Sequence, residues 1–189
     1  MIEGRVTALR AIEEADLAQL LAWRNSPGLR RYFREVRELN STQQRAWFDN
    51  KVNGDASTRM LAVVEVATAR LLGDTEERRL LGACGLCYID WVNRTADFSL
   101  YVGADERYID DMWAPDAAIT LIRYAFEELG LNRLWSEIYA FDAPKAALFK
   151  SLGFQLDGRH RQTHWAEGGW HDSLYFSLLA SDTRPAYRV

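Results

Sequence analysis

The sequence contains few cysteines, histidines and prolines: two, three and four among 189 residues. Cys84 and Cys87 form a single C-x-x-C without the second ligand pair that a zinc site needs. They lie in a predicted strand, LLGACGLCYI, where positions three apart point to opposite faces. His160, His164 and His171 share a predicted hairpin, but no carboxylate accompanies them at a metal-binding spacing. We therefore read both cysteines as small buried hydrophobic residues and expect no metal.

The sequence also lacks a long apolar run and an excess of positive charge. No stretch approaches the roughly 20 apolar residues of a membrane span. The first residues, MIEGRVTALRAIEEAD, contain no apolar signal-peptide centre. Twenty-three basic against 27 acidic residues give a net charge of −4, without the basic bias typical of nucleic-acid binding. We expect a cytoplasmic protein that binds neither membrane nor nucleic acid.

Hydrophobic residues are abundant, at 48% of the chain, and include seven Trp, eight Tyr and eight Phe. The length suits one domain with an aromatic core or pocket. The periodicities predict, in order, a strand, two helices, three strands, a helix, a strand, a helix and two strands. This order is typical of an α/β (α+β) fold with a mixed sheet.

Several boundaries carry specific signals. The first strand is expected at Arg5–Leu9, and Ser41 with Gln44 resembles a capping box at the start of the second helix. The stripe of apolar residues after Pro115 predicts the clearest helix, and Gly130 favours its end. Residues 68–79 are charged and predict an exposed loop, and the final hairpin turns at residues 167–169.

Six segments in this order resemble the GNAT superfamily of acyl-CoA-dependent N-acyltransferases. They are LRAIEEADLAQLLAWRN, STQQRAWF, LLGACGLCYIDWVNRTADFSLYVG, LIRYAFEELGLNRLWSEIYAF, DAPKAALFKSLGF and GGWHDSLYFSLL. Within that superfamily the chain is most similar to the branch of ribosomal-protein alanine and amino-sugar-nucleotide acetyltransferases. The resemblance implies a single domain over residues 1–189. It also implies a strongly twisted mixed sheet of about seven strands with about four helices.

The same resemblance implies that acetyl-CoA or another acyl-CoA enters between two splayed parallel strands, 98–102 and 134–139. The pyrophosphate would rest on the start of the helix near Ala114, where unpaired N–H groups and the helix dipole favour anions. The positions implied to contact the cofactor are Leu100, Tyr101, Val102, Arg107, Met112, Trp113, Ala114, Asp142 and Phe149.

Five positions depart from the family pattern. The phosphate turn, Gln/Arg-x-x-Gly-x-Gly/Ala in the family, aligns with Ile109, Met112 and Ala114, and only the last fits. Asp110 stands where glycine is frequent; at about 6 Å, its charge would repel one phosphate charge by about 0.7 kcal/mol in water and nearly 3 kcal/mol at an effective dielectric constant of 20. Asp142 replaces the usual Asn, and Phe149 replaces the Tyr that is a candidate acid. The turn therefore resembles a degenerate phosphate-binding loop.

The reaction needs a base that takes a proton from the amine. Asp97 aligns with a family position often filled by Glu and is the first candidate, although a turn carboxylate near Arg94 is an equal alternative. Glu137 is the second candidate, with an ion pair to Arg133 or to a helix as its alternative. Tyr101 and Tyr139 are candidates to replace the missing acid, although core packing explains both.

The resemblance places the amine acceptor near the first two helices and the final hairpin. Candidate acceptor-binding residues are Arg24, Tyr32, Arg34, His164 and Trp165. The acceptor is a small-molecule, amino-sugar or peptide amine, and a homodimer is the candidate assembly. Three interpretations stay open: an active N-acyltransferase, an enzyme with a shorter or different acyl donor, and a GNAT fold that has lost catalysis and serves as a binding or assembly module.

Overall fold

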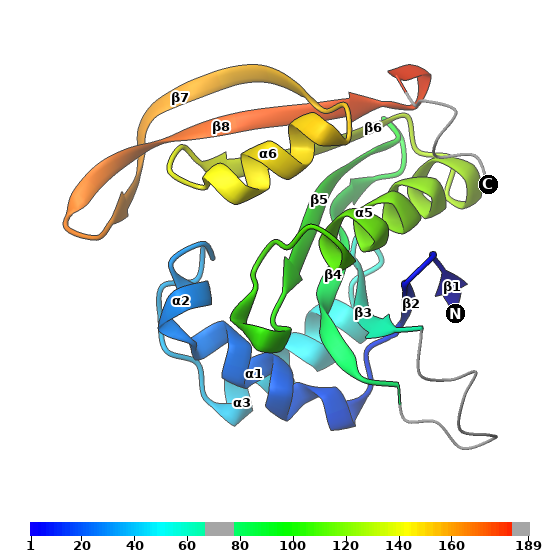
Figure 1. Ribbon diagram of the computed structural model, residues 1–189, viewed down its shortest axis with the longest axis vertical. Helices are drawn as coiled ribbons and strands as arrows, with labels where there is room; N and C mark the ends of the chain where they lie inside the picture. The colour runs from blue at the N-terminus through cyan, green and yellow to red at the C-terminus, as the bar shows by residue number, and fades with distance from the viewer. Residues whose placement is uncertain (67–77, 183–189) are drawn as a thin grey trace.

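A computed structural model describes residues 1–66 and 78–182, so most of the loop expected at 68–79 lies outside the described residues. One eight-stranded sheet runs through the molecule in the order β1-β2-β3-β4-β5-β6-β8-β7 (Figure 1). The strands are β1 Ile2–Glu3, β2 Thr7–Ala11, β3 Arg59–Glu65, β4 Leu80–Asp90, β5 Thr95–Val102, β6 Arg133–Tyr139, β7 Gln155–Ala166 and β8 Gly169–Leu179. The expected mixed α/β fold is confirmed, with the short β1 as an additional strand and β2 beginning two residues later than predicted.

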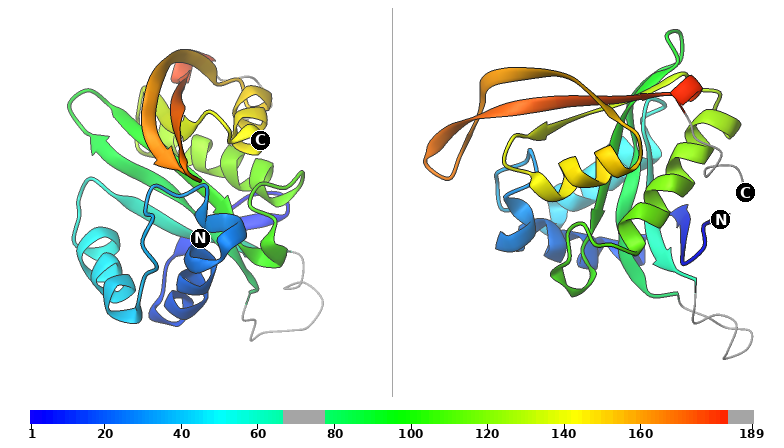
Figure 2. Two further views of the ribbon diagram at one scale, coloured as in Figure 1. Left: turned by 90° about the vertical axis from the view of Figure 1, so that its left-hand side faces the viewer. Right: turned by 45° about the horizontal axis from the view of Figure 1, so that its top comes forward.

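Helices cover both faces of this sheet (Figure 2). They are α1 Leu17–Asn25, α2 Pro27–Arg30, α3 Ser41–Trp47, α5 Trp113–Arg123 and α6 Ala143–Ser151. Helices α1 to α3 pack in one apolar cluster with Ala62 and Tyr101, whereas α5 and α6 pack in a second cluster with Phe98 and Leu134. The sheet therefore separates two layers of helices, and both layers have their own buried core.

Local chemistry explains where these helices begin and end. The capping box of α3 is formed by Asn40 and Gln43, one residue before the predicted pair, because Asn40 has the extended backbone of an N-cap and its side chain accepts the Gln43 N–H at 2.9 Å. The predicted stop at Gly130 holds, with a φ of +64°, and Gly153 after α6 has a φ of +84°; both conformations favour glycine after a helix.

Strands β5 and β6 are parallel neighbours that pair over three residues only. Thr95, Ala96 and Asp97 pair with Arg133, Leu134 and Trp135, and no pairing of the two strands continues beyond Asp97 in the described structure. Strand β6 instead pairs along its whole length with β8, while β5 stays paired with β4. The predicted gap between 98–102 and 134–139 is therefore confirmed.

Asp116, in the first turn of α5, ties this helix to the start of β2. Its carboxylate accepts the backbone N–H groups of Arg5, Val6 and Thr7 at 3.0, 3.1 and 2.9 Å, and the Thr7 hydroxyl at 2.7 Å. Burial alone would raise the pKa of Asp116, but these hydrogen bonds lower it below its ordinary value. The carboxylate joins segments that are more than 100 residues apart.

We expect Asp116→Ala to lower the free energy of unfolding by about 2 kcal/mol at neutral pH, because three backbone donors and a hydroxyl lose a charged acceptor. Since the folded-state pKa is depressed, the loss should begin to shrink as the pH falls through the unfolded-state pKa of about 4 and should disappear below the folded-state pKa, where the carboxylate is protonated in both states. Urea unfolding at several pH values measures both effects. Asp111→Ala, at an exposed neighbour, is the matched control, and equal losses in the two variants would contradict this role.

Candidate active site

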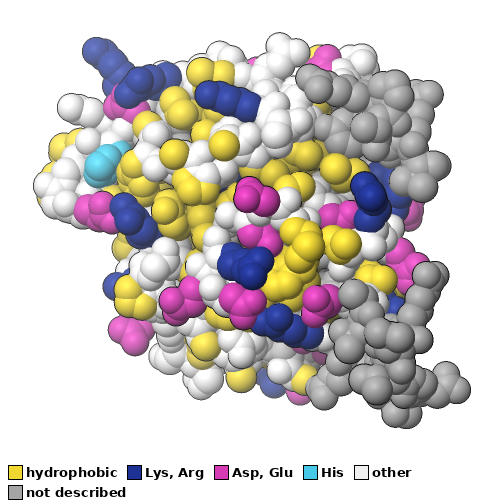
Figure 3. Space-filling model, viewed as in Figure 1, with side chains coloured by type: hydrophobic (Ala, Val, Ile, Leu, Met, Phe, Trp, Pro, Cys, Tyr) yellow, Lys and Arg dark blue, Asp and Glu magenta, His cyan; other side chains and the backbone are white. Residues whose placement is uncertain are grey.

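A cavity of about 290 Å³ lies where β5 and β6 separate. Figure 3 shows apolar side chains on the face of Figure 1, around α6 and the start of α5, with acidic and basic side chains among them. The cavity is lined by Arg24, Tyr32, Phe33, Arg34, Glu35, Cys87, Tyr88, Asp97, Phe98, Ser99, Leu100, Tyr101, Ser136, Glu137, Ile138, Tyr139, Asp142, Lys145 and His164. Side chains from both diverging strands thus meet segments from both helical layers.

Asp97 is the last residue of β5 that still pairs with β6. Its side chain is buried, with the residue 7% exposed, and one Oδ lies 4.0 Å from the Arg34 guanidinium. Burial, together with the nearby charge of Glu137, raises the pKa of Asp97 to about 6, although Arg34 and Lys145 act in the opposite direction. Asp97 therefore changes charge just below neutral pH, as a general base at this site would need to.

Glu137 has a different environment, although it lines the same cavity. Arg34 lies 3.7 Å from one carboxylate oxygen and also donates to the Glu137 backbone carbonyl at 3.0 Å, while His164 lies 3.4 Å from the other oxygen. Burial opposes ionisation, but hydrogen bonds from Ser173 and Tyr175 and the charge of Arg34 keep the pKa of Glu137 below its ordinary value. This carboxylate is consequently a weaker proton acceptor than Asp97.

Four tyrosines line the cavity, Tyr32, Tyr88, Tyr101 and Tyr139, and three of them make contacts that fix their place. The Tyr139 hydroxyl donates to the Phe33 carbonyl at 3.3 Å, and its ring meets His164 edge-on. Burial raises the pKa of Tyr139, and raises that of Tyr101 to about 12, so both phenols keep their protons at neutral pH. Tyr32 stacks on Tyr108, with ring centroids 4.0 Å apart.

Arg24 enters the cavity from the end of α1. Its guanidinium lies over the Phe33 ring at 5.4 Å, and its buried Nε has no hydrogen-bond partner among the described residues. A buried donor without an acceptor destabilises the folded protein by about 1–3 kcal/mol. A group that accepted the hydrogen bond of the Arg24 Nε–H would therefore be bound favourably.

The backbone of β5 faces the gap at alternate residues. The Val102 N–H donates to the Tyr108 carbonyl at 2.7 Å, and the Gly103 N–H donates to Leu81 of β4 at 2.8 Å. Because successive residues of a strand direct their backbone groups to opposite sides, Tyr101 faces β4 and Leu100 faces the gap. Of the three backbone positions implied by the family resemblance, Leu100 is the one that remains accessible to an added extended chain.

A carboxylate of the same chain, that of Asp110, already occupies the start of α5. One carboxylate oxygen of Asp110 accepts the Ala114 N–H at 2.7 Å, and the other lies 3.4 Å from Arg107. The Arg107 guanidinium also covers the ring of Trp113 at 4.6 Å. Met112 and Asp111 are exposed. Asp110 therefore occupies the helix N–H group that a phosphate oxygen would use.

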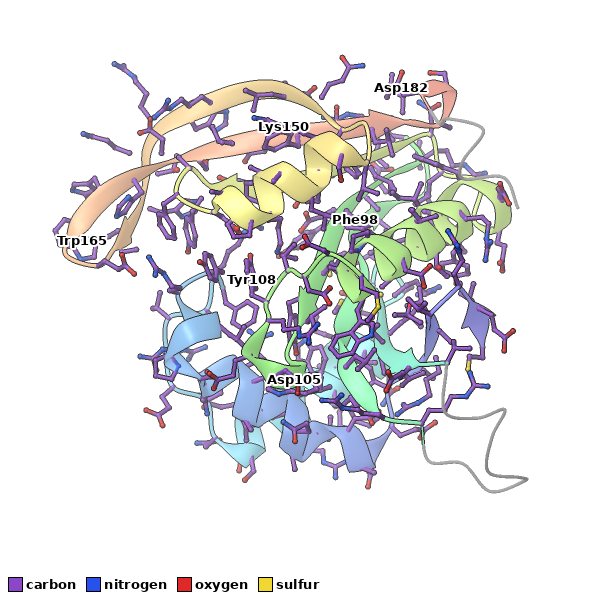
Figure 4. The ribbon with its side chains drawn as sticks, in the orientation of Figure 1. Phe98, Asp105, Tyr108, Lys150, Trp165 and Asp182 are labelled. Carbon is purple, nitrogen blue, oxygen red and sulfur yellow. The ribbon has the colours of Figure 1, made fainter. Side chains whose placement is uncertain are left out.

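A second contact closes the space between this loop and α6. Asp142 is the N-cap of α6, and its side chain accepts both the Lys145 N–H at 3.1 Å and the Tyr108 hydroxyl at 2.5 Å. Burial raises the pKa of Asp142, with Lys145 opposing it. Figure 4 shows Tyr108 in the opening between α6 and the helices of the opposite layer. Tyr108 and Asp142 thus connect the two sides of the gap through a buried hydrogen bond.

The structure gathers ten of the sequence-predicted site residues around the cavity: Arg24, Tyr32, Arg34, Asp97, Leu100, Tyr101, Glu137, Tyr139, Asp142 and His164. Seven others lie outside its lining: Val102, Arg107, Met112, Trp113, Ala114, Phe149 and Trp165. Phe149 packs in the core against Phe98 and Phe154, and Trp165 packs against Trp170 at the exposed end of the hairpin.

The cavity lining also includes Lys145, Cys87 and Ser136, which the sequence did not single out. Lys145 follows the helix cap Asp142 by three residues, a spacing that puts both on one side of the first turn. Burial raises the pKa of Cys87 to about 11, so the thiol stays protonated. Within the described residues, no group of three or more His, Cys, Asp or Glu side chains is arranged to hold a metal.

Comparison with known proteins identifies the family. Residues 7–155 match the family model described as Acetyltransferase (GNAT) domain. The chain belongs to the GNAT acetyltransferase family. It is accordingly an acetyltransferase, and acetyl-CoA is the co-substrate of its family. Along residues 1–66 and 78–182, no helix of this GNAT protein has the length and apolar character needed to cross a membrane.

Individual relatives agree with this assignment. The chain is 28% identical over 175 residues to the uncharacterized N-acetyltransferase p20 of Bacillus licheniformis, covering 90% of this chain and 91% of that protein. It is 24% identical over 178 residues to spermidine N(1)-acetyltransferase of Vibrio cholerae, with 92% of each covered. A crystal structure of Vibrio cholerae spermidine N-acetyltransferase in complex with CoA and spermine superposes with a TM-score of 0.80, at 20% identity, covering 93% of this chain and 96% of that chain.

Proposed function

We propose that this protein transfers the acetyl group of acetyl-CoA to the primary amine of a small molecule, amino sugar or peptide, with Asp97 as the general base. The observation that carries the proposal is a buried carboxylate with a pKa of about 6 at the point where β5 and β6 separate. A base with a pKa close to the working pH is both ionised and basic enough to accept a proton.

The proposed chemistry follows from the groups around Asp97. The amine nitrogen gives a proton to the Asp97 carboxylate and attacks the thioester carbon, and the carbon–sulfur bond then breaks. Among the tyrosines that line the cavity, Tyr139 and Tyr101 have raised pKa values and keep their protons, so either supplies the proton for the departing thiolate. Glu137, which pairs with Arg34 and lies 3.4 Å from His164, holds Arg34 beside Asp97.

The donor is proposed to enter from the side of α5 and α6. The backbone of Leu100 offers the N–H and C=O that an extended pantetheine chain would pair with. Arg107 and the N–H groups at the start of α5 are suited to phosphate, provided that the Asp110 carboxylate leaves them. The loop is degenerate in this sense: its own carboxylate competes with the anion of the ligand.

The acceptor is proposed to enter from the side of α1 and α2, where Arg24, Tyr32, Arg34 and His164 line the cavity. Relatives named for polyamine acetylation, and the Bacillus subtilis protein YdaF, named provisionally for ribosomal N-acetylation and 33% identical over 100 residues, support an amine acceptor. A homodimer is part of the proposal, since a Vibrio cholerae structural neighbour is described as dodecameric.

Asp97→Asn should lower kcat by about 10²–10⁴-fold with little change in acetyl-CoA affinity, because it removes the base and keeps the shape of the side chain. In the wild type, kcat/KM should fall as the pH drops through about 6, where Asp97 becomes protonated. The Asn variant should lose that dependence. CoA release measured between pH 5 and 8, with Glu137→Gln as the parallel variant, checks this. Near-normal turnover of Asp97→Asn would remove Asp97 from the mechanism.

Asp110→Gly should tighten acetyl-CoA binding ten-fold or more, because it frees the Ala114 N–H, breaks one of the two ion pairs of Arg107 and removes a repelling charge. The gain should shrink with added salt, since exposed charges are screened beyond about 10 Å at 0.1 M. The same variant should unfold about 1 kcal/mol more easily, through loss of a helix cap. Calorimetric titration and thermal unfolding measure the two effects.

Asp111→Gly is the matched control, because this exposed neighbour carries the same charge and makes none of the hydrogen bonds described for Asp110. It should change acetyl-CoA affinity by less than Asp110→Gly. If Asp110→Gly folds normally and binds acetyl-CoA no more tightly than wild type, the Asp110 carboxylate does not compete with the cofactor.

A further inference from the structure

Lys145 places a primary amine inside the proposed acetyl-transfer cavity. The sequence has only three lysines, Lys51, Lys145 and Lys150, among its 23 basic residues. Lys51 is exposed and pairs with Asp55 at 3.1 Å, and Lys150 is exposed on α6. Figure 4 shows Lys150 on the far side of α6 from Tyr108. Lys145 alone among the three lines the cavity.

The Lys145 amine contacts an aromatic ring and makes no ion pair with any of the described residues. Its Nζ lies over the Tyr108 ring at 5.1 Å, and among the described residues the one ion pair that a lysine makes is that of Lys51 with Asp55. The charged and titratable groups that act on it come from three elements: Asp97 of β5, Asp142 at the start of α6, and Arg34 from the segment after α2. A partly buried ammonium without a carboxylate partner is costly, which favours the neutral amine.

Electrostatics agree with that geometry. Burial lowers the pKa of Lys145 below its ordinary value, with Asp142 and Asp97 opposing the shift and Arg34 adding to it. A neutral lysine amine is a nucleophile of the same kind as the acceptor amine. The proposed base Asp97 is one of the two carboxylates that act on it.

We propose that Lys145 is an internal acetyl acceptor, acetylated on Nζ by the acetyl-CoA bound in its own chain. This inference rests on the proposed function, since it uses the same donor and the same base. Nζ attacks the thioester carbon, the carbon–sulfur bond breaks, and the Nζ proton passes through Asp97 to the thiolate. The products are Nε-acetyl-Lys145 and CoA.

Acetylation would change the site as well as mark it. The protonated form of Lys145 lowers the pKa of Asp97, and acetylation abolishes that form, so the pKa of Asp97 rises. The acid limb of the pH profile for transfer to an added amine should therefore move to higher pH in the acetylated protein. Lys145→Gln, which lacks the charge, should reproduce the shift, whereas Lys145→Arg should keep the wild-type profile.

The experiment incubates the purified full chain with acetyl-CoA and maps acetylated peptides by mass spectrometry over time. We expect Lys145 to be acetylated faster than Lys51 and Lys150, at a rate that does not depend on protein concentration. Asp97→Asn should slow the reaction by about 10²–10⁴-fold. Circular dichroism confirms that each variant is folded, and Lys150→Arg is the matched control.

Equal labelling of the three lysines, or no label on Lys145, would overturn the inference. The results that contradict the proposed function differ from those that contradict the inference about Lys145. Transfer to an added amine, such as spermidine or glucosamine, without label on Lys145 leaves the proposed function intact. If Lys145 is labelled but no added amine is acetylated, the inference is supported. The proposal that the protein acetylates a separate amine acceptor is then contradicted.

Discussion

The separation of β5 from β6 after three paired residues is the constraint on which the site depends. Strand β6 is held by β8 and β5 by β4, so neither strand follows the other beyond Asp97. The backbone of Leu100 then faces a cavity instead of a neighbouring strand. Burying a strand edge without partners is unfavourable, and an extended ligand that supplies the missing hydrogen bonds is stabilised there.

Charge in the cavity is organised around Arg34. Its guanidinium lies between the carboxylates of Asp97 and Glu137, at 4.0 and 3.7 Å. Glu137 has further donors and stays ionised, whereas Asp97 is buried with fewer partners and has a raised pKa. Two carboxylates on neighbouring strands therefore differ in their capacity to accept a proton, and the difference arises from burial and hydrogen bonding.

Hydrophobic periodicity predicted the order of the elements. The resemblance to the GNAT superfamily, and not the periodicity, implied the gap and the ten predicted residues that line the cavity. Asp97 and Glu137 were both candidates, and the sequence held no information on their partners. The alternative partner named for Glu137 was wrong: Arg133 pairs with Asp157, and Glu137 pairs with Arg34. Distinguishing the two required distances and burial.

Other features depend on contacts that no local pattern encodes. From the sequence, the charge of Asp110 is expected to repel phosphate. In the structure, its carboxylate also accepts the Ala114 N–H at the start of α5. Phe149 reads as a replaced catalytic tyrosine and packs in the core. Lys145 was not predicted because the first turn of α6 has no marked apolar periodicity. Its place in the cavity follows from the packing of α6 over the gap.

The central claim is that acetyl-CoA lies along the free edge of β5. Amide hydrogen exchange of Leu100, followed by NMR with and without saturating acetyl-CoA, tests it most directly. The Leu100 amide should exchange about ten-fold or more slowly when the cofactor is bound, because its N–H gains an acceptor. The Val102 amide, already bonded to Tyr108, should change little. Unchanged exchange at Leu100 in the saturated protein would contradict the account.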